Sequence, residues 1–487
     1  MYNDSKLNEK ELEILRNAVD KAEKITGKLL VKSENIQTII KIVENYIRDN
    51  KLICYGGTAI NNILPKEDQF YNLEVELPDY DFFSTNAITD AKKLSDIYYK
   101  LGYTDVEAKA GLHTGTYKVF VNFIPVADIT QLNTEIFNSL KKHSIKINNI
   151  LYTPPNFLRM SMYLELSRPR GDISRWEKIL KRLFLLNKHY PIDNPKCKST
   201  NFMRKFQGTI QESKQLLYII KKTLADQGVV FFGAYASSLY NSYYKSNHFD
   251  KKSPDFDVLS EEPKKAAIIL KERLEDNGFT NIKIYKKPGI GEIIAPHYEV
   301  VYGSDSLAYI YKPMACHSYN IISINNINIK IATIDTIMSF YLAFLFSNRK
   351  YYDHERIYCM AHFLFNTQKY NRLKQKGLLK RFSLKCYGNQ TTIEDIRTNK
   401  SQKFKELKAL KESNKGNYVK EYEKYFLKYI PDIEFNKNKN KNKNKNKKTK
   451  KAQSLPIIVT KNKRKTKNKR KAKNKNKTKN KKKANSV

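Results

Sequence analysis

Two stretches of sequence, ICYGGTAIN (53–61) and LPDYDFFS (77–84), decide the fold of the first half of this chain. The first joins a short apolar run to two glycines and a helix-compatible segment, which is typical of a strand that turns into a helix. The second places two aspartates after an alternating apolar run, which is typical of a strand. Short strands interleaved with helical segments predict an α/β (α+β) fold with mixed sheets.

The same patterns recur later in the chain. VFFGAYASSLY (230–240) parallels the first stretch and SPDFDVLS (253–260) parallels the second. LPDYDFFS and SPDFDVLS are each followed by a Lys-containing helical segment, which ends in LGYT in the first case and in NGFT in the second. Further on, ILYTPPNFLRMSMYLEL parallels IKIATIDTIMSFYLAF. Four matched blocks in the same order indicate that one domain has been duplicated.

The duplication and the changes in composition divide the chain into six predicted segments. These are an N-terminal helical segment (1–50), a first α/β domain (51–153), a helical connecting region (154–227), a degenerate second α/β domain (228–334), a C-terminal helical region (335–435) and a tail (436–487). Gly27 is expected to divide two helices in the first segment. The Lys/Asn-rich tail has too few apolar residues for a core and is expected to be disordered.

The charge of the chain favours a polyanionic partner. The formal net charge is +41; residues 436–487 contain 24 Lys and Arg and no acidic residue, so residues 1–435 still carry +17. Such an excess favours nucleic acid over a membrane, because it neutralises phosphates and raises encounter rates. No stretch reaches the roughly 18 apolar residues that a membrane span needs, so no membrane partner is expected.

The cysteines are widely spaced. Cys54, Cys197, Cys316, Cys359 and Cys386 form no CxxC pair. We therefore expect a reducing compartment and no structural zinc.

Three carboxylates and a glycine turn are the candidates for chemistry. Gly56, Gly57 and Thr58 lie where backbone N–H groups and a helix N-terminus would face a triphosphate, although such a turn alone is more often only a turn. Asp79 and Asp81 share one face if they lie on a strand, and Asp128 ends an apolar run. Carboxylates gathered in this way repel one another, and two divalent cations would relieve that repulsion. Asp79 and Asp81 would bind both cations, and Asp128 would bind the cation on the side of the nucleophile. For the Asp-x-Asp pair, the alternative is a solvated turn.

Taken in chain order, the glycine turn after a strand, the Asp-x-Asp pair and the single aspartate on a later strand resemble the signature of the polymerase beta-like nucleotidyltransferase superfamily. The resemblance implies two tandem nucleotidyltransferase-like domains, a mixed sheet carrying the acids, two Mg2+ or Mn2+ ions and a nucleoside triphosphate donor. The interval from Gly57 to Asp79 is longer than is usual there and predicts an inserted loop around 66–71.

Over roughly residues 30–430 the chain resembles the poly(A) polymerase catalytic subunits of giant DNA viruses of the mimivirus type, and more distantly the poxvirus one. CYGGTAINNILP, DYDFF, VADIT and RPRGDISRWEKILKRLFLL carry this resemblance. It implies addition of AMP from ATP to the 3′ ends of messenger RNA, without a template. It also implies a homodimer and a cytoplasmic location, in the viral factory or the virion.

The second copy is expected to be catalytically dead. It keeps Gly233, Asp255 and Asp257. Ala234 replaces the second glycine, and SLAYIYKP (306–313) has no acid at the place of the third carboxylate, since Asp305 precedes it. Packing or RNA contact would explain why this copy is kept.

A cationic helix is the candidate RNA contact. Its apolar stripe is Ile173, Trp176, Ile179, Leu180 and Leu183, and its predicted RNA-binding cations are Arg168, Arg170, Arg175, Lys178, Lys181 and Arg182. These cations are expected to face RNA phosphates or the triphosphate. An ordinary solvated basic face is the alternative.

Three other interpretations stay open at this point. The chain could be a terminal nucleotidyltransferase that adds other nucleotides or makes oligoadenylates, or an RNA-binding protein built on two inactive transferase folds. The tail could tether RNA, carry a nuclear address in KNKRKTKNKRK, or reflect codon drift.

Overall fold

The computed structural model describes residues 4–431, except 73, 199, 245–248, 250–253 and 413–417. The chain begins with the helices α1 (Asp4–Lys32) and α2 (Glu34–Asp49). They are divided at Ser33, whose backbone is extended, and not at Gly27, which lies inside α1. A single glycine costs a helix only about 1 kcal/mol, so the helix continues through it.

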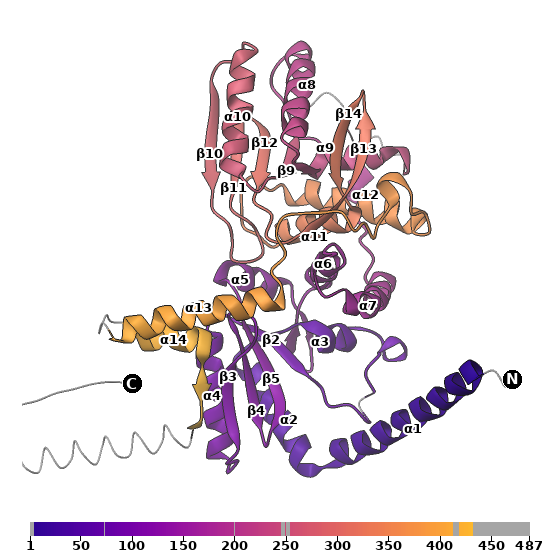
Figure 1. Cartoon of the computed structure of the whole chain (residues 1–487), viewed down its shortest axis with the longest axis vertical. Coiled ribbons are helices and arrows are strands. Elements are labelled where there is room, and N and C mark those ends of the chain that lie inside the picture. The colour runs from indigo at the N-terminus through magenta and orange to yellow at the C-terminus, as the bar shows by residue number, and fades with distance from the viewer. Residues whose placement is uncertain are drawn as a thin grey trace, which may run out of the picture. The chain divides into compact units, whose positions relative to one another are not determined.

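The first sheet contains eight strands in the order β16-β3-β4-β5-β2-β1-β7-β6. They are β1 (Ile53–Cys54), β2 (Tyr80–Ser84), β3 (Val106–Ala110), β4 (Thr116–Val121), β5 (Ile124–Gln131), β6 (Ile145–Ile147), β7 (Ile150–Tyr152) and β16 (Lys428–Tyr429). The helices α3 (Gly56–Ile63), α4 (Ala87–Lys100) and α5 (Thr134–His143) connect them. Parallel and antiparallel neighbours both occur, so the sheet is mixed (Figure 1).

The second sheet repeats the first, with the order β10-β11-β12-β9-β8-β14-β13-β15. Its strands are β8 (Val230–Phe232), β9 (Phe256–Leu259), β10 (Ile282–Lys287), β11 (His297–Tyr302), β12 (Asp305–Tyr311), β13 (His317–Ile324), β14 (Ile327–Ala332) and β15 (Cys386–Tyr387). The helices α8 (Ile210–Asp226), α9 (Gly233–Ser238) and α10 (Pro263–Asp276) correspond to α2, α3 and α4. Seven strands thus match in order, which confirms the predicted fold class.

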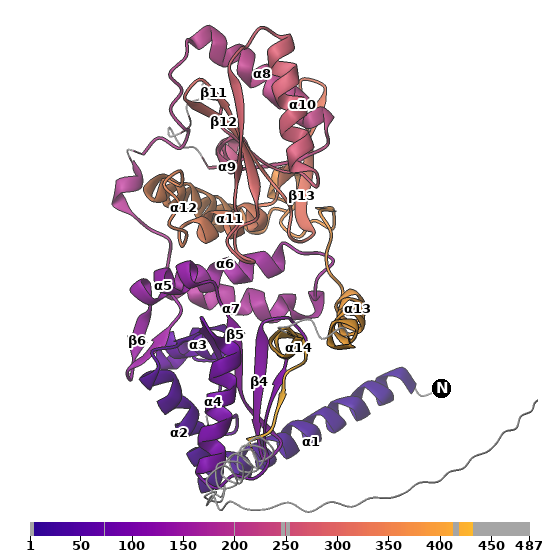
Figure 2. The same ribbon diagram turned by 90° about the vertical axis from the view of Figure 1, so that its left-hand side faces the viewer.

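Four helices lie between the two sheets (Figures 1 and 2). They are α6 (Pro155–Leu166), α7 (Trp176–His189), α11 (Ile334–Phe344) and α12 (His354–Asn371). The equivalent helices α6 and α11 pack against each other. Every residue of α11 is buried, as expected for a helix that is apolar on all sides. This packing joins the two copies through one hydrophobic core.

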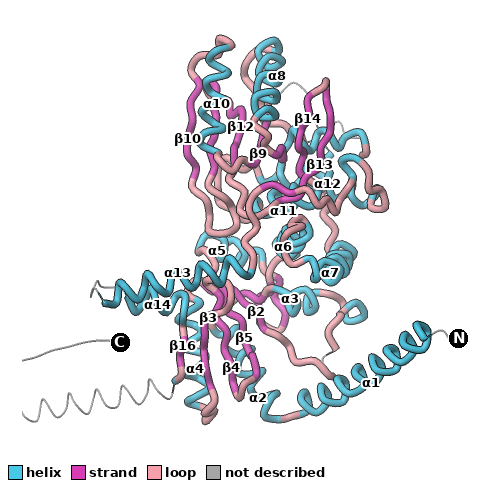
Figure 3. Tube along the Cα trace, viewed as in Figure 1, coloured by secondary structure: helices cyan, strands magenta, loops and turns pink. Residues whose placement is uncertain are grey.

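The last described elements return to the first sheet. After α13 (Ile393–Glu412) and α14 (Tyr418–Phe426), strand β16 pairs with β3, the two strands running antiparallel (Figure 3). The C-terminal region predicted to be helical therefore also contributes one short strand to each sheet, β15 and β16. The predicted disordered tail (436–487) lies outside the described residues.

Four cysteines are paired in disulfides. Cys197 is bonded to Cys359 and Cys316 to Cys386, with a Cα–Cα distance of 5.1 Å in each pair. Wide spacing along the chain does not limit distance in the fold, so the argument for a reducing compartment was wrong. Separately, none of the described helices combines the length and the apolar character that crossing a membrane requires.

Candidate active site

The predicted phosphate turn lies directly beside the predicted acids. Strand β1 ends at Cys54, and Gly56 opens α3 with φ +73°, a backbone conformation that favours glycine. A Cβ on Gly56 would lie 2.5 Å from Asp81 Oδ2, so only glycine fits without displacing the carboxylate. Thr58 Oγ1 donates a 2.6 Å hydrogen bond to the backbone oxygen of Asp79. The turn and the acidic strand are thus fastened to each other.

Two of the three predicted acids are direct neighbours across the sheet. Asp81 on β2 and Asp128 on β5 are Cα partners in a parallel strand pair. Asp79 precedes β2 by one residue and reaches solvent, whereas Asp81 and Asp128 are partly buried. Side chains two residues apart on a strand share a face, so β2 directs Asp81 toward Asp128 and Asp79 follows the same side.

The acids repel one another, and Asp81 and Asp128 are partly removed from solvent. Burial, and after it the charges of Asp79 and Asp128, raise the pKa of Asp81 to about 7. Loss of solvent and the charge of Asp128 also raise the pKa of Asp79. Such crowding of negative charge favours cations, and carboxylate oxygens are the donors that Mg2+ and Mn2+ prefer. The donor types therefore fit divalent metal.

A lysine already occupies part of this site. Lys118 on β4 is the Cα partner of Asp128, and its ammonium forms an ion pair with that carboxylate. Within the described part of the chain, no three Asp, Glu, His or Cys side chains are arranged so that they could hold a metal ion. The predicted acids therefore lie together without forming a ready-made metal cage.

The raised pKa of Asp81 predicts a pH dependence of stability. The folded chain retains a proton up to about pH 7 that an unfolded aspartate loses near pH 4. In the absence of divalent cations, stability is therefore full below about pH 4 and is lost as the pH rises through about 7. We expect Asp81→Asn to be more stable than the native chain at neutral pH by roughly 1–2 kcal/mol, and no more stable in acid. Urea unfolding at both pH values, in chelator, measures this; equal stabilisation at both would contradict it.

The predicted inserted loop is packed against the glycine turn. It contains the 3-10 helix η1 (Lys66–Asp68), and Asn61 Oδ1 on α3 accepts hydrogen bonds from the backbone N–H groups of Phe70 and Tyr71 at 2.8 and 2.9 Å. The Tyr71 hydroxyl occupies the space where Gly57 would carry a Cβ. Gly57 is therefore needed because an aromatic side chain lies over it.

Arg182 belongs to this turn rather than to the exposed face where the helical pattern placed it. Its side chain is buried; it donates a 2.9 Å hydrogen bond to Tyr71 Oη and lies over the ring of Phe70 at 4.8 Å. Its Nη2 atom is 3.0 Å from the ideal Cβ position of Gly57. The helical spacing could not reveal this, because the loop that covers Arg182 comes from residues more than a hundred positions earlier.

The other predicted cations are mostly at the surface. Arg170, Arg175, Lys178 and Lys181 are exposed, and Arg168 is half-buried. Arg175 pairs with Glu165 at 3.7 Å and Lys181 with Glu177 at 2.6 Å. The charges of Arg175 and Lys178 nevertheless act on the acids, because they lower the pKa of Asp81 and of Asp79 respectively. Ile173, predicted in the apolar stripe, is 58% exposed.

The second copy shows what replaced its third acid. Asp257 on β9 is the Cα partner of Tyr309 on β12, so Tyr309 stands where the first copy has Asp128. Gly233, with φ +78°, lies against Asp257 as Gly56 lies against Asp81. The predicted loss of this carboxylate thus has a defined substitute.

Arginines close the rest of that second site. Arg204 forms an ion pair with Asp255, and its backbone N–H donates to Asp255 Oδ2 at 2.8 Å. Arg356 Nη1 lies 2.9 Å from the same oxygen, and Arg204 lies 3.6 Å from Asp257. Burial alone would raise the pKa of Asp255, but the two guanidinium groups outweigh it and lower the pKa. Fixed internal charges thus occupy the space that a metal ion would need.

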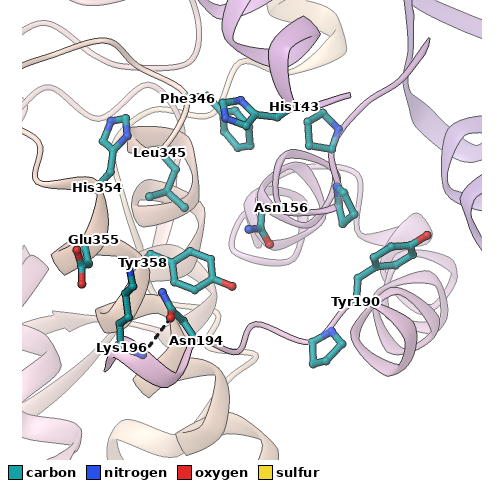
Figure 4. Close-up of a pocket in the computed structure, with 13 residues that line it drawn as sticks. His143, Asn156, Tyr190, Asn194, Lys196, Leu345, Phe346, His354, Glu355 and Tyr358 are labelled. Carbon is teal, nitrogen blue, oxygen red and sulfur yellow. Dashed lines mark hydrogen bonds between the residues drawn. The ribbon is translucent and has the colours of Figure 1, made fainter. Parts of the chain in front are cut away.

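A separate cavity of about 550 Å3 lies at the ends of α5, α6, α7, α11 and α12 (Figure 4). His143, Asn156, Tyr190, Phe346 and Tyr358 are among its lining residues. None of the predicted acids, glycines or cations lines it. The candidate chemistry is therefore not in this cavity.

The first copy of the duplicated domain has recognisable relatives. Residues 41–172 match the family model of the poly(A) polymerase catalytic subunit. The matched segment includes the glycine turn and all three acids. The resemblance to poly(A) polymerases predicted from the sequence is thus confirmed.

Two relatives of the matched segment are viral proteins. A candidate poly(A) polymerase catalytic subunit of Acanthamoeba polyphaga mimivirus is 33% identical over 190 residues, which are 38% of this chain and 32% of that protein. One from African swine fever virus (isolate Pig/Kenya/KEN-50/1950) is 32% identical over 188 residues, 37% of this chain and 39% of that protein. The matches thus span about a third of the length of these relatives.

A solved structure shares the fold over most of the chain. The crystal structure of the Megavirus polyadenylate synthase aligns with a TM-score of 0.73 and covers 93% of this chain and 90% of that one. Sequence identity is 20%, so this likeness concerns the fold alone.

Proposed function

We propose that this chain is a template-independent polynucleotide adenylyltransferase, a poly(A) polymerase that adds AMP from ATP to RNA 3′ ends. The observation that carries the proposal is the pairing of Asp81 with Asp128 beside Gly56, inside the segment that matches the poly(A) polymerase family model. A protein that only bound RNA would gain nothing from three crowded carboxylates, because their repulsion costs stability.

The proposed chemistry uses two Mg2+ or Mn2+ ions held by Asp79, Asp81 and Asp128. Bound there, they would supply activation of a 3′ hydroxyl and stabilisation of the leaving pyrophosphate. The chain itself would bind the triphosphate through the N–H groups of residues 56–58 and the N-terminus of α3. Tyr71 and Arg182, which lie over Gly57, would orient the phosphates and exclude water from them.

RNA would be bound by the exposed cations Arg170, Arg175 and Lys178, of which Arg175 and Lys178 act on the acids through their charge. Their charge is available to phosphates, and Arg168 and Lys181 extend the same surface. A homodimer, and a cytoplasmic location in the viral factory or the virion, belong to this proposal through the resemblance alone.

A primer-extension assay tests the function. The native chain is incubated with labelled RNA, divalent cation and each of the four nucleoside triphosphates separately. Long primer-dependent products with ATP alone are expected. Equal use of the other triphosphates would favour a different terminal transferase, and products without a primer would favour an oligoadenylate synthetase. No product with any triphosphate would overturn the proposal.

Arg182→Gln tests the assignment of this residue to the triphosphate instead of RNA. Loss of a charge-assisted contact with phosphate is expected to raise the KM for ATP about tenfold. RNA affinity and its salt dependence are expected to stay unchanged. Lys181→Gln, one residue earlier on the exposed face, is the matched control and should leave the KM for ATP unaltered. A loss of RNA affinity in Arg182→Gln with native KM for ATP would show that Arg182 binds RNA and not the triphosphate.

A further inference from the structure

One ammonium group serves all three acids of the first copy. Lys118 pairs with Asp128, and its charge also lowers the pKa of Asp79 and of Asp81 against the effect of burial. The charge of Lys118 therefore acts on all three acids, and its direct contact is with Asp128. No trio of acids in the described residues is arranged to hold a metal ion, and Lys118 is already paired with one member of this trio.

The pair is placed so that it can open. The side chain of Lys118 is 39% exposed and that of Asp128 is 17% exposed, so the ammonium approaches the carboxylate from the solvent side. A lysine is a flexible chain with a compact charge, and partly exposed ion pairs are weak. A divalent cation that approaches from solvent can therefore compete with it.

The second copy lacks this arrangement. By strand register, Glu299 on β11 stands where the first copy has Lys118, and it accepts a 2.8 Å hydrogen bond from Tyr309 Oη. Glu299 pairs with Lys287 at 2.8 Å, and the aspartates of the second copy are neutralised by Arg204 and Arg356, whose side chains are largely buried. The aspartates of the second copy thus have buried guanidinium groups as counter-ions. Asp128 of the first copy has a partly exposed lysine, which can be exchanged.

We propose that Lys118 is a built-in competitor of the divalent cation for Asp128, and that cation entry requires its ammonium to withdraw. This inference rests on the proposed metal site of the first copy. Lys118 is a positioning residue: it holds the acids together in the metal-free chain and sets the cation concentration that the site needs.

Binding of Mn2+ to the full chain, followed through the electron paramagnetic resonance signal of free Mn2+, tests the proposal without catalysis. Lys118→Met and Lys118→Gln are expected to bind Mn2+ about fivefold more tightly than the native chain, because the competing charge is gone. Lys118→Arg is expected to bind Mn2+ no more tightly than native. Lys109→Met is the matched control: Lys109 on β3 is the Cα partner of Lys118 and its side chain is 45% exposed, and its loss should leave Mn2+ binding unchanged.

Unchanged or weaker Mn2+ binding in both neutral variants would overturn the proposal, as would equal tightening in Lys109→Met. Tighter binding in the neutral variants alone supports it, whether or not the chain extends RNA. Failure of the poly(A) polymerase assay with tighter Mn2+ binding would remove the proposed function and leave the competition standing. Native RNA extension with unaltered Mn2+ affinity in the variants would overturn the proposed competition and leave the proposed function standing.

Discussion

Asp81→Asn is expected to lower the rate of AMP addition to RNA about a thousandfold. Metal ions contribute several kcal/mol to transition-state stabilisation in such reactions, and each 1.4 kcal/mol corresponds to a factor of about ten. Asp81 is the acid that touches both partners of the proposed site, because it pairs with Asp128 and lies against Gly56. Single-turnover primer extension at saturating ATP measures the rate. The amide has the same shape as the carboxylate, so the fold should be kept.

The matched control for this variant is Asp257→Asn. Asp257 holds the same place in the second sheet, against Gly233 and opposite Tyr309. We expect it to leave the rate of AMP addition within a factor of about three of native. Loss of activity in Asp257→Asn with an active Asp81→Asn would show that the two copies have been assigned the wrong way round.

Asp255→Ala is expected to destabilise the protein by about 3–5 kcal/mol. The carboxylate is fully buried and neutralises Arg204 and Arg356, whose side chains are only 16% and 12% exposed. Removing it leaves Arg356 without the carboxylate that it bonds, and leaves Arg204 with only the more distant Asp257, at 3.6 Å, in a low-dielectric interior. Urea unfolding followed by the fluorescence of the aromatic core measures the loss.

Asp79→Ala, the equivalent change in the first copy, is the control for stability. Asp79 reaches solvent and is repelled by Asp128, so its loss is expected to change the free energy of unfolding by less than about 1 kcal/mol while abolishing RNA extension. Equal destabilisation by the two variants would contradict the view that only the second cluster has become structural.

Local patterns in the sequence were sufficient for the elements of the site. The glycines in CYGGTAIN allow the positive φ at Gly56, and alternation around DYDFF predicts a strand with its acids on one face. The internal repeat predicted two similar domains with mixed sheets. These signals were readable because they depend on neighbours within a few residues.

Signals that depend on distant pairing were not readable. Lys118 could not be assigned to Asp128, because the choice of cross-strand partner depends on the register of β4 and β5. The disulfides join residues 162 and 70 positions apart, and spacing in sequence suggested no pairing. Arg182 was placed on the wrong side of its helix because the loop that buries it is far away in the chain.

By itself, the amino-acid sequence determined the duplicated α/β fold, the glycine turn and the types of residue available for chemistry, since all of these follow from local conformation and from repetition. Tertiary structure alone decided which side chains lie together: Asp81 beside Asp128, Lys118 paired with Asp128, and Tyr309 in place of the missing acid. The physical reason is that strand order and register follow from burial of the whole core, to which residues from both halves of the chain contribute.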